Sequence, residues 1–382
     1  MALDLQNLRQ EINETDKDIV DLFKKRMNIA ASVAEYKKQN GLPVLDAARE
    51  RALLTRISDM AGEEFDVYAR TLYHTMLDVS RAYQYTKLGG GSEVCKSIKA
   101  ALEATDKVFP SRARVACQGV EGAYSQIATE KLFELPAIDY YTSFDGVFDA
   151  IEQGKCDYGV LPIENSTAGS VKKVYELMLG HEFHIVRSVR LKIDHNLLSK
   201  KGARLENIKE IISHEQAISQ CGAFLRSLGD VKITVAPNTA VAAKTVAQSG
   251  RDDIAALSSR FCAELYGLEN LAPSVQDMGN NYTRFICISK NAEIYPGADK
   301  LSLMMVTPNK PGALYHVLSC FNALGINMTK LESCPIPERD FESMFYFDFT
   351  VSVYSDHLER LLCELEARGE RYKLLGAYSE II

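Results

Sequence analysis

The chain has 382 residues, of which 46% are hydrophobic and 25% are charged, and its formal net charge at pH 7 is −7. This length fits two or three domains, and the composition is ordinary for a globular protein. The negative charge, without any long basic stretch, argues against a protein that binds nucleic acid or a membrane surface.

No apolar run reaches transmembrane length, and the polar N-terminal stretch lacks the hydrophobic segment of a signal peptide. The nine cysteines are odd in number and have no CxxC spacing, which favours reduced thiols over a disulfide framework or a zinc site. We therefore expect a cytoplasmic protein that needs no metal and no other cofactor.

Residues 1–88 are expected to form an all-helical domain. The first 36 residues repeat apolar side chains with the 3-4 spacing of heptads, which is typical of a long helix packed lengthwise against others. Arg26 interrupts this apolar seam. It either extends out of a loose seam into solvent, or it is kept in a buried pocket to receive an anion.

Helical geometry relates Arg26 to two other cations. Lys37 lies 11 residues further on, about three helical turns, so it returns to nearly the same face at a distance of roughly 16 Å. A small anion fits between two such long side chains. Arg9 lies 17 residues before Arg26, roughly 25 Å away and on a different face. If Arg9 binds ligand, it must reach a pocket in a partner subunit.

A second helix is predicted after Pro43, and a third carries Ser80 and Gln84 four residues apart on one face. In order and spacing, one constellation resembles the active-site set of the all-helical chorismate mutases. It comprises Arg9, Arg26, Lys37, Asp46, Arg49, Glu50, Ser80 and Gln84. That family forms intertwined homodimers in which the N-terminal arginine comes from the other chain. The resemblance implies that these eight residues bind chorismate.

The residue types fit that reaction. Chorismate carries two carboxylates, which arginines bind through pairs of hydrogen bonds. The rearrangement to prephenate is pericyclic and needs no nucleophile or general base. It needs the substrate held in a compact diaxial conformer, and stabilisation of the charge that grows on the breaking ether oxygen. The resemblance gives this second, catalytic task to Lys37 and Gln84.

The glycine-rich stretch at 86–93 marks a boundary, so we expect a linker over 89–111 and an α/β domain with mostly parallel strands over 112–290. Polar side chains lie where apolar strands of this domain end. They fall in the segments 158–171, 212–221 and 277–289. Because ligands bind beyond the carboxyl ends of strands in an open α/β sheet, we expect these segments to meet at one site.

These segments carry motifs that resemble the prephenate dehydratase family: PIENS followed by GS, SH-x-QA-x-x-QC, and N-x-TRF. The family has two α/β lobes with a cleft between them, like a periplasmic binding protein. The resemblance implies that Thr283 assists the departure of the ring hydroxyl, and that Asn165, Ser213 and Gln220 act with it in catalysis. The residues implied to bind prephenate are Asn165, Ser166, Ser213, Gln220, Thr283 and Arg284.

Prephenate is already poised to aromatise, so neutral donors suffice if they are preorganised in a dry cleft. Several of the implied residues also have simpler roles. Asn165, Ser166 and Ser213 can each cap a following helix, and Arg284 can support its loop instead of binding a carboxylate. The family often has threonine or serine at the position of Ala123, so one hydroxyl is missing here.

Residues 298–382 are predicted to follow the order β-α-β-β-α-β, a ferredoxin-like α+β fold that is common in small ligand-sensing domains. They resemble the ACT regulatory domains attached to prephenate dehydratases. This implies a phenylalanine site at an ACT–ACT interface, formed by Gly312, Ala313, Leu314, Glu332 and Ser333. Cys334 replaces the arginine that is usual in the family, which bears on the strength of phenylalanine feedback. The alternative is a domain that only dimerises.

Together, the resemblances predict a three-domain homo-oligomer, a dimer or a tetramer. It would convert chorismate to prephenate and prephenate to phenylpyruvate, with feedback by phenylalanine. Three alternatives stay open: a non-catalytic amino-acid sensor, an arogenate dehydratase, and a mutase whose second domain has lost activity. The complete mutase set and the complete dehydratase motifs favour the bifunctional enzyme.

Overall fold

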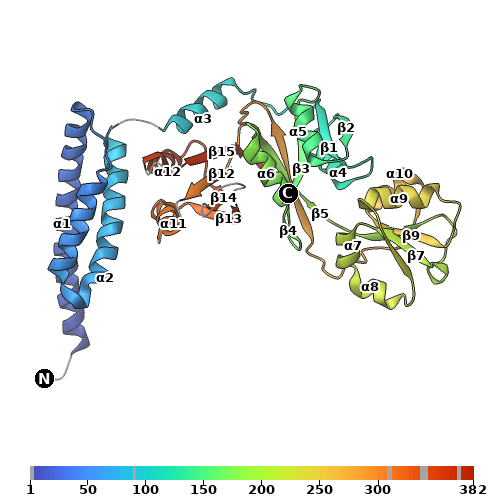
Figure 1. The fold of residues 1–382 in the computed structure, drawn as a ribbon, viewed down its shortest axis with the longest axis horizontal. Helices are drawn as coiled ribbons and strands as arrows, with labels where there is room; N and C mark the ends of the chain where they lie inside the picture. Colours follow the sequence, from blue (N-terminus) through green and yellow to red (C-terminus); the bar gives the residue numbers. More distant parts are fainter. Residues whose placement is uncertain (1–3, 89–91, 308–311, 336–342, 368–370) are drawn as a thin grey trace.

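The structure, a computed structural model, describes residues 4–88, 92–307, 312–335, 343–367 and 371–382. A helical unit lies at one end of the molecule, and two α/β lobes form the other end (Figure 1). A smaller domain, built from the C-terminal part of the chain, lies between them. Among the described helices, none is both long and apolar enough to cross a membrane.

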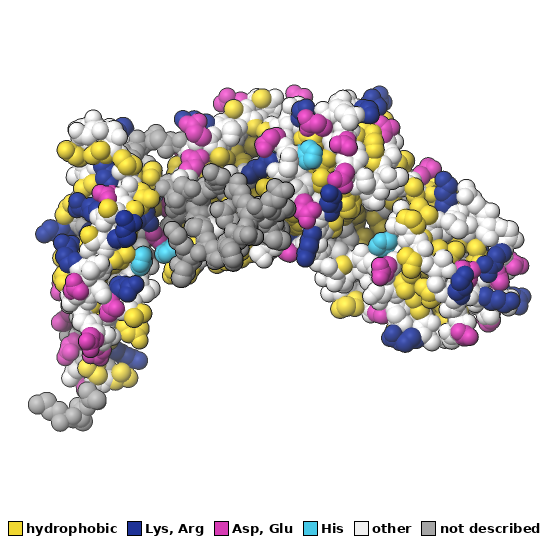
Figure 2. Space-filling view, in the orientation of Figure 1, with side chains coloured by type: hydrophobic (Ala, Val, Ile, Leu, Met, Phe, Trp, Pro, Cys, Tyr) yellow, Lys and Arg dark blue, Asp and Glu magenta, His cyan; other side chains and the backbone are white. Residues whose placement is uncertain are grey.

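The helical unit consists of α1 (Leu5–Gln39) and α2 (Ala47–Leu88). Gly62 interrupts α2 with a φ of +70°, a left-handed conformation that favours glycine, so α2 comprises the second and third helices that the sequence predicts. The heptad seam of α1 is largely uncovered within the described chain: Ile12, Ile19 and Leu22 are 59%, 57% and 65% exposed. Apolar side chains show on this unit in the space-filling view (Figure 2).

The first lobe is a seven-stranded sheet in the order β16-β5-β11-β3-β1-β2, with β4 paired to β3. Helices α4, α5 and α6 pack against it. The strands are β1 (Arg114–Gln118), β2 (Ala137–Tyr141), β3 (Tyr158–Asn165), β4 (Gly169–Ser170), β5 (His184–Lys192), β11 (Tyr282–Ser289) and β16 (Glu380–Ile381). The helices are α4 (Tyr124–Leu132), α5 (Phe144–Glu152) and α6 (Lys172–Gly180).

The second lobe is a five-stranded sheet in the order β10-β6-β9-β7-β8. Its strands are β6 (Asn196–Ser199), β7 (Glu210–Ser213), β8 (Lys232–Val235), β9 (Ile254–Ser258) and β10 (Glu269–Ala272). Its helices are η1 (Leu205–Asn207), α7 (Glu215–Gln220), α8 (Gly222–Ser227), α9 (Thr239–Gln248) and α10 (Arg260–Tyr266). The chain enters this lobe after β5 and returns to the first lobe as β11, so two crossings join the lobes.

The prediction of mostly parallel strands was wrong, because both sheets are mixed. In the first lobe β11 runs antiparallel to both β3 and β5, and in the second lobe β6 runs antiparallel to β9 and β10. The return crossing explains the first of these reversals. β5 leads toward the second lobe and β11 leads back from it, so β11 lies antiparallel to β5 and to its other neighbour β3.

The C-terminal domain follows the predicted β-α-β-β-α-β order, with a four-stranded antiparallel sheet ordered β13-β14-β12-β15. Its elements are β12 (Lys300–Thr307), α11 (Ala313–Ala323), β13 (Asn327–Pro335), β14 (Ser343–Thr350), α12 (Asp356–Ala367) and β15 (Arg371–Tyr378). The stretch predicted as a linker contains α3 (Glu93–Ala104), whose Cys95, Ile98 and Ala101 belong to the apolar core of this domain. It is therefore a packed part of the domain.

The end of the chain ties the C-terminal domain to the first lobe. β16 pairs in parallel with β5, and Glu380 forms ion pairs with Arg190 (2.8 Å) and Lys300 (3.2 Å). Gly376 lies so close to β5 that a Cβ there would be 2.1 Å from the carbonyl oxygen of Ile185. Only glycine permits this approach, so the sheet of the C-terminal domain packs directly against the first lobe.

Candidate active sites

A pocket of about 710 Å³ lies in the helical unit, within the usual size range of ligand sites. The structure brings seven of the eight predicted chorismate residues to its lining: Arg26, Lys37, Asp46, Arg49, Glu50, Ser80 and Gln84. Arg9 lies near the start of α1 and does not line it. This agrees with the helical geometry, which predicts that Arg9 is too far from Arg26 to reach the same pocket.

Some polar atoms that line this pocket are hydrogen-bonded within the protein, and others are buried without a partner among the described residues. Lys37 Nζ donates to the carbonyl oxygen of Val44 (2.5 Å). Gln84 Nε2 donates to two oxygens of Ser80, the backbone carbonyl oxygen (3.2 Å) and the hydroxyl oxygen (3.3 Å). Gln84 Oε1 and one terminal nitrogen of Arg26 are buried without a partner among the described residues. Since buried polar atoms are normally paired, a bound ligand is the natural partner for both.

The sequence analysis missed Arg81, which also lines this pocket. Arg81 forms ion pairs with Glu50 and with Asp78, and only 13% of its side chain is exposed. Its position directly after Ser80, in the part of α2 that lines the pocket, could have identified it as a pocket residue. Glu50 therefore enters the pocket already paired with a cation.

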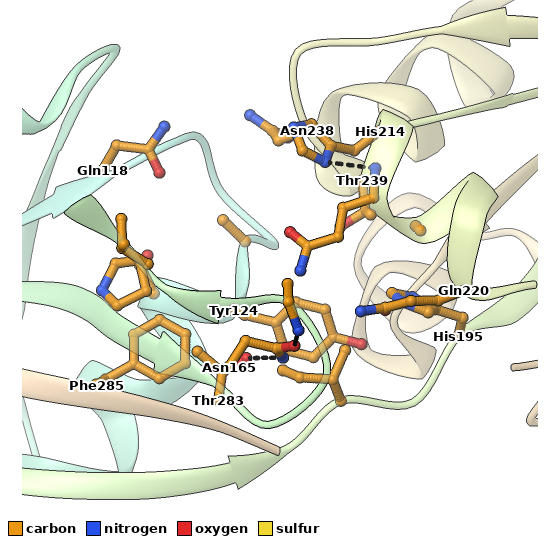
Figure 3. Close-up of a pocket in the computed structure, with 18 of the residues that line it drawn as sticks. Gln118, Tyr124, Asn165, His195, His214, Gln220, Asn238, Thr239, Thr283 and Phe285 are labelled. Atoms are coloured by element: carbon orange, nitrogen blue, oxygen red, sulfur yellow. Dashed lines mark hydrogen bonds between the residues drawn. The ribbon is translucent and has the colours of Figure 1, made fainter. Parts of the chain in front are cut away.

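A second pocket, of about 560 Å³, lies between the two α/β lobes. Asn165 and Thr283 from the first lobe and Gln220 from the second line it, and Figure 3 shows them on facing sides of the space. The carboxyl end of β3 and the start of β11 lie side by side, pairing Asn165 with Thr283. This places two of the predicted polar segments at one point, as the strand-end argument requires.

Two backbone groups determine how the amides in this pocket are oriented. Asn165 Oδ1 accepts hydrogen bonds from the N–H groups of Thr167 (3.0 Å) and Ala168 (2.8 Å), which can only donate. Its Nδ2 therefore donates to Asn281 Oδ1 (2.8 Å) and Thr283 Oγ1 (2.9 Å). Because Thr283 Oγ1 accepts there, its own hydrogen is directed elsewhere and is free to donate to a ligand.

The orientation of Asn165 also determines the orientation of Gln220 in the second lobe. Since the Asn281 oxygen is used by Asn165, Asn281 Nδ2 donates to Gln220 Oε1 (2.8 Å). Gln220 Nε2 then donates to Thr167 Oγ1 (2.8 Å), which joins the two lobes behind the pocket. His195 Nε2 lies 3.0 Å from Gln220 Oε1, so Nε2 is the nitrogen that carries the hydrogen.

His195 is a pocket residue that the sequence analysis did not single out. It lies between β5 and β6 and is buried, and its Nδ1 has no partner among the described residues. Burial lowers the pKa of His195, against smaller opposing effects of its hydrogen bond to Gln220 and of Asp194. His195 is therefore a neutral acceptor at the cleft. Asn281 was also missed, although it is the first residue of the N-x-TRF motif.

Helix N-termini supply positive potential to this pocket. None of the lining residues in the described chain is a lysine or an arginine. Helices α4 and α6 begin after Ala123 and Val171, and neither residue makes a side-chain cap. Their first N–H groups are therefore available to a ligand, and α9 begins after Asn238 on the opposite lobe. Such a pocket suits an anion bound by backbone groups.

Three residues predicted to bind prephenate do not line this pocket, and Ser166 and Ser213 are two of them. The Ser166 hydroxyl donates to the carbonyl oxygen of Asn280 (2.9 Å) and accepts from the N–H of Tyr282 (2.9 Å). The Ser213 hydroxyl is fully buried and donates to the carbonyl oxygen of Leu257 (2.7 Å), which joins β7 to β9. Both hydroxyls hold backbone in place; they do not face the cleft.

Arg284 is the third, and it lies on the opposite side of β11, toward the C-terminal domain. Its side chain is 2% exposed and forms ion pairs with Glu164 (2.8 Å) and with Asp348 of β14. Lys330 of β13 joins this group through an ion pair with Glu164 and a hydrogen bond to the hydroxyl of Ser170 (2.8 Å). Neighbouring residues of one strand point to opposite faces, which explains why Thr283 and Arg284 part here.

The residues expected to form the effector site lie in two places. Gly312 starts α11 with a φ of +84°, while Glu332 and Ser333 lie in β13. The Glu332 carboxylate accepts a hydrogen bond from the hydroxyl of Ser170 (2.8 Å), a residue that lines the interlobe pocket. The side chain of Cys334 lies outside the described residues.

Family models match two parts of the chain: Chorismate mutase type II over residues 8–85 and Prephenate dehydratase over residues 115–293. The bifunctional chorismate mutase/prephenate dehydratase of Escherichia coli K12 is 31% identical over 381 residues, covering 97% of this chain and 95% of that protein. Arogenate dehydratase/prephenate dehydratase 2 of Arabidopsis thaliana is 36% identical over 311 residues, covering 78% and 81%. The structure of a prephenate dehydratase from Arthrobacter aurescens in complex with L-Phe has a TM-score of 0.63 and 25% identity, covering 70% of this chain and 90% of that one.

Proposed function

This chain belongs to the family of bifunctional chorismate mutase/prephenate dehydratases, and from that premise we propose which residues carry each step and how the steps are regulated. The enzyme rearranges chorismate to prephenate and then decarboxylates and dehydrates prephenate to phenylpyruvate, in phenylalanine biosynthesis.

The pocket of the helical unit is the proposed mutase site. Arg26 and Arg49 bind the substrate carboxylates, and the unpaired nitrogen of Arg26 supports this role. Lys37 donates to the ether oxygen that gains charge in the transition state. Gln84 presents an unpaired oxygen as the structure stands, so its donor role requires its amide to turn. Asp46 and Glu50 take the hydroxyl and orient neighbours, and Ser80 holds Gln84.

A second copy completes this site in the proposal. The exposed seam of α1 is the supporting observation, because an apolar heptad stripe of this length is stable when another helix covers it. An intertwined homodimer would cover the seam and would bring Arg9 of the partner subunit to the pocket. We propose the dimer as the minimal active unit of the mutase, in a cytoplasmic enzyme.

The interlobe pocket is the proposed dehydratase site. Loss of CO₂ from prephenate sends an electron pair through the ring, and the C–O bond to the ring hydroxyl breaks. The departing hydroxyl gains negative charge as this bond breaks, and the free hydrogen of Thr283 is placed to donate a hydrogen bond to it. The released hydroxide takes its proton from water, so Thr283 keeps its own. The N–H groups of Thr167 and Ala168 orient the Asn165 amide so that it donates to Thr283 Oγ1 and leaves the hydrogen of Thr283 free, and this orientation is the single observation that carries the assignment.

The other predicted dehydratase residues divide between two roles. Gln220 joins the lobes and orders the amides around Asn165, so it acts by positioning. Ser166, Ser213 and Arg284 act by holding the backbone and the domain contact. The substrate carboxylates are held by the first N–H groups of α4, α6 and α9.

Feedback by phenylalanine is the proposed function of the C-terminal, ACT-type domain. The solved relative from Arthrobacter aurescens is described as a complex with L-Phe. Ligand binding near Gly312 or Glu332 would reach the dehydratase site through Glu332 and Lys330, which both contact the hydroxyl of Ser170. Phenylalanine then inhibits if it favours the domain arrangement in which Ser170 and the start of α6 are misplaced for prephenate.

An assay with chorismate as the only substrate tests the assignment of both sites. Wild type should consume chorismate and form phenylpyruvate, while Thr283→Ala should consume chorismate equally fast and accumulate prephenate. Arogenate is the alternative substrate for the second reaction, because the Arabidopsis relative is named for both arogenate and prephenate. Parallel assays with prephenate and arogenate should give the larger kcat/KM with prephenate. Normal phenylpyruvate formation by Thr283→Ala would refute the role of Thr283.

A further inference from the structure

The helical unit touches the C-terminal domain at a polar contact close to the mutase pocket. His316, on α11, places its Nδ1 3.1 Å from Oδ2 of Asp78, on α2. A carboxylate can only accept, so His316 Nδ1 is the donor and carries a hydrogen. The ring of His74 lies 5.7 Å from that of His316, and burial, followed by the proximity of His316, lowers the pKa of His74. The carboxylate of Asp78 therefore belongs to the contact between the helical unit and the C-terminal domain.

That carboxylate is joined to the chorismate pocket. Asp78 uses Oδ2 for His316 and Oδ1 for one terminal nitrogen of Arg81. The other terminal nitrogen of Arg81 donates to Oε1 of Glu50. Arg81 and Glu50 both line the pocket. A continuous relay thus runs from His316 through Asp78 and Arg81 to Glu50, and each member uses a different atom for each neighbour.

These contacts affect substrate binding because Glu50 carries a carboxylate in a pocket proposed to bind chorismate, which has two carboxylates. An unpaired carboxylate beside two substrate carboxylates would weaken binding by repulsion. Arg81 offsets that charge, and its planar fork is held between two carboxylates, so it presents one orientation to Glu50. The hydrogen bond from His316 contributes to the orientation of the second carboxylate, Asp78, whose side chain is 13% exposed.

We propose that Arg81 and Asp78 position Glu50 for the mutase reaction, and that His316 of the C-terminal domain holds Asp78 in place for them. These three are positioning residues, since they act on substrate through Glu50. Through His316, the C-terminal domain of the same chain then contributes to the order of the mutase site.

Through the same contact, a ligand bound to the C-terminal domain could change the mutase site. Gly312 lies beside His316, because a Cβ at Gly312 would be 3.4 Å from His316 Nε2. A ligand bound at the start of α11 would therefore lie next to the ring that holds Asp78. This part of the inference rests on the proposed phenylalanine site, whereas the role of His316 in the unliganded enzyme does not.

The test uses the full-length enzyme with three variants: His316→Ala, His316→Asn and the control His357→Ala. Asparagine keeps a nitrogen donor near the position of Nδ1. His357 is a histidine of the same domain whose ring contacts the carbonyl oxygen of Leu324. We expect His316→Ala to lower mutase kcat/KM about fivefold or more, the usual lower bound of coupling between sites. His316→Asn should recover most of this loss, and His357→Ala should match wild type.

Dehydratase activity, measured with prephenate on the same samples, separates positioning from unfolding. It should stay unchanged in all three variants. Unchanged mutase activity in His316→Ala would overturn the proposal, and so would a loss that His316→Asn does not recover. Parallel loss of both activities would also overturn it, because the residue would then be structural.

Phenylalanine titration tests the effector route separately. In wild type, phenylalanine should inhibit both activities, and in His316→Ala it should inhibit only the dehydratase. Equal inhibition of the mutase in both proteins would refute the route through His316. Absence of any inhibition in wild type would refute the proposed effector site, while the comparison of basal mutase activities would stand by itself.

Discussion

Replacing Arg284 with methionine should destabilise the dehydratase region and leave its chemistry largely intact. The side chain is 2% exposed and lies between Glu164 and Asp348, and the Asp348 side chain is fully buried. Methionine fills similar space but leaves these carboxylates without their shared cation. Removing one partner of a buried ion pair costs about 3–5 kcal/mol.

The lower end of that range applies here. Glu164 keeps its ion pair with Lys330, and Asp348 keeps the hydrogen bond from the hydroxyl of Ser302. A loss of about 3 kcal/mol lowers the melting temperature of a unit of this size by roughly 6–12 °C. Thermal unfolding followed by circular dichroism measures this shift. The kcat and KM for prephenate, measured below the unfolding transition, show whether the dehydratase chemistry is kept.

Arg190→Met is the matched control. Arg190 lies opposite Arg284 in the pairing of β5 with β11, but its side chain is 43% exposed in its ion pair with Glu380. An exposed pair contributes about 1 kcal/mol or less, so the control should shift the melting temperature little. Combining Arg284→Met with Asp348→Asn should recover part of the lost stability. If Arg284→Met instead kept its melting temperature and raised the KM for prephenate tenfold, Arg284 would be a substrate ligand, and the reasoning from the buried pair would be wrong.

Ile19→Glu, in the exposed seam of α1, should give monomers by analytical ultracentrifugation and abolish mutase activity while dehydratase activity persists; an active monomer would contradict the shared site. Lys37→Met should lower mutase kcat about 100-fold or more with little change in KM, since the donor acts on charge that grows only in the transition state. His195 has a lowered pKa when folded, so its neutral form contributes stability that is present above the unfolded pKa of about 6.5 and is lost as pH falls toward the folded pKa. His195→Gln should therefore flatten the loss of stability below pH 6.5 in urea unfolding, and an unchanged slope would contradict the buried neutral ring.

How far the sequence predicted this site depended on the kind of information each residue carries. Helical spacing related Arg26 to Lys37 and Ser80 to Gln84, and the resemblance to the chorismate mutases joined the two pairs; the structure brings all four to one pocket. Asn165 and Thr283 lie at strand ends, where a ligand site is expected in an α/β sheet. Local spacing and strand-end position, together with the family motifs, identified these residues.

Other features depend on contacts between distant segments, which periodicity does not encode. Ser213 and Arg284 have the same polar character as true pocket residues, and only the pairing of β7 with β9 and of β11 with the C-terminal domain turns them away. The antiparallel insertion of β11 and the packing of α3 on the C-terminal domain have the same origin. His195 was missed because a lone histidine between two apolar strands carries no motif.

In the proposed assignment the two pockets bind dianions through different groups, and the two reactions explain the difference. In the mutase both carboxylates keep their charge throughout the rearrangement, so arginine pairs stabilise substrate and transition state alike while orienting the substrate. In the dehydratase one carboxylate loses its charge as CO₂ leaves. A guanidinium bound to that carboxylate would stabilise the ground state more than the transition state and would slow the step. A lining without arginine or lysine among the described residues, with helix N-termini and amide donors instead, avoids that penalty. The neutral residues of the N-x-TRF segment are thus suited to decarboxylation, and its one arginine supports the domain contact.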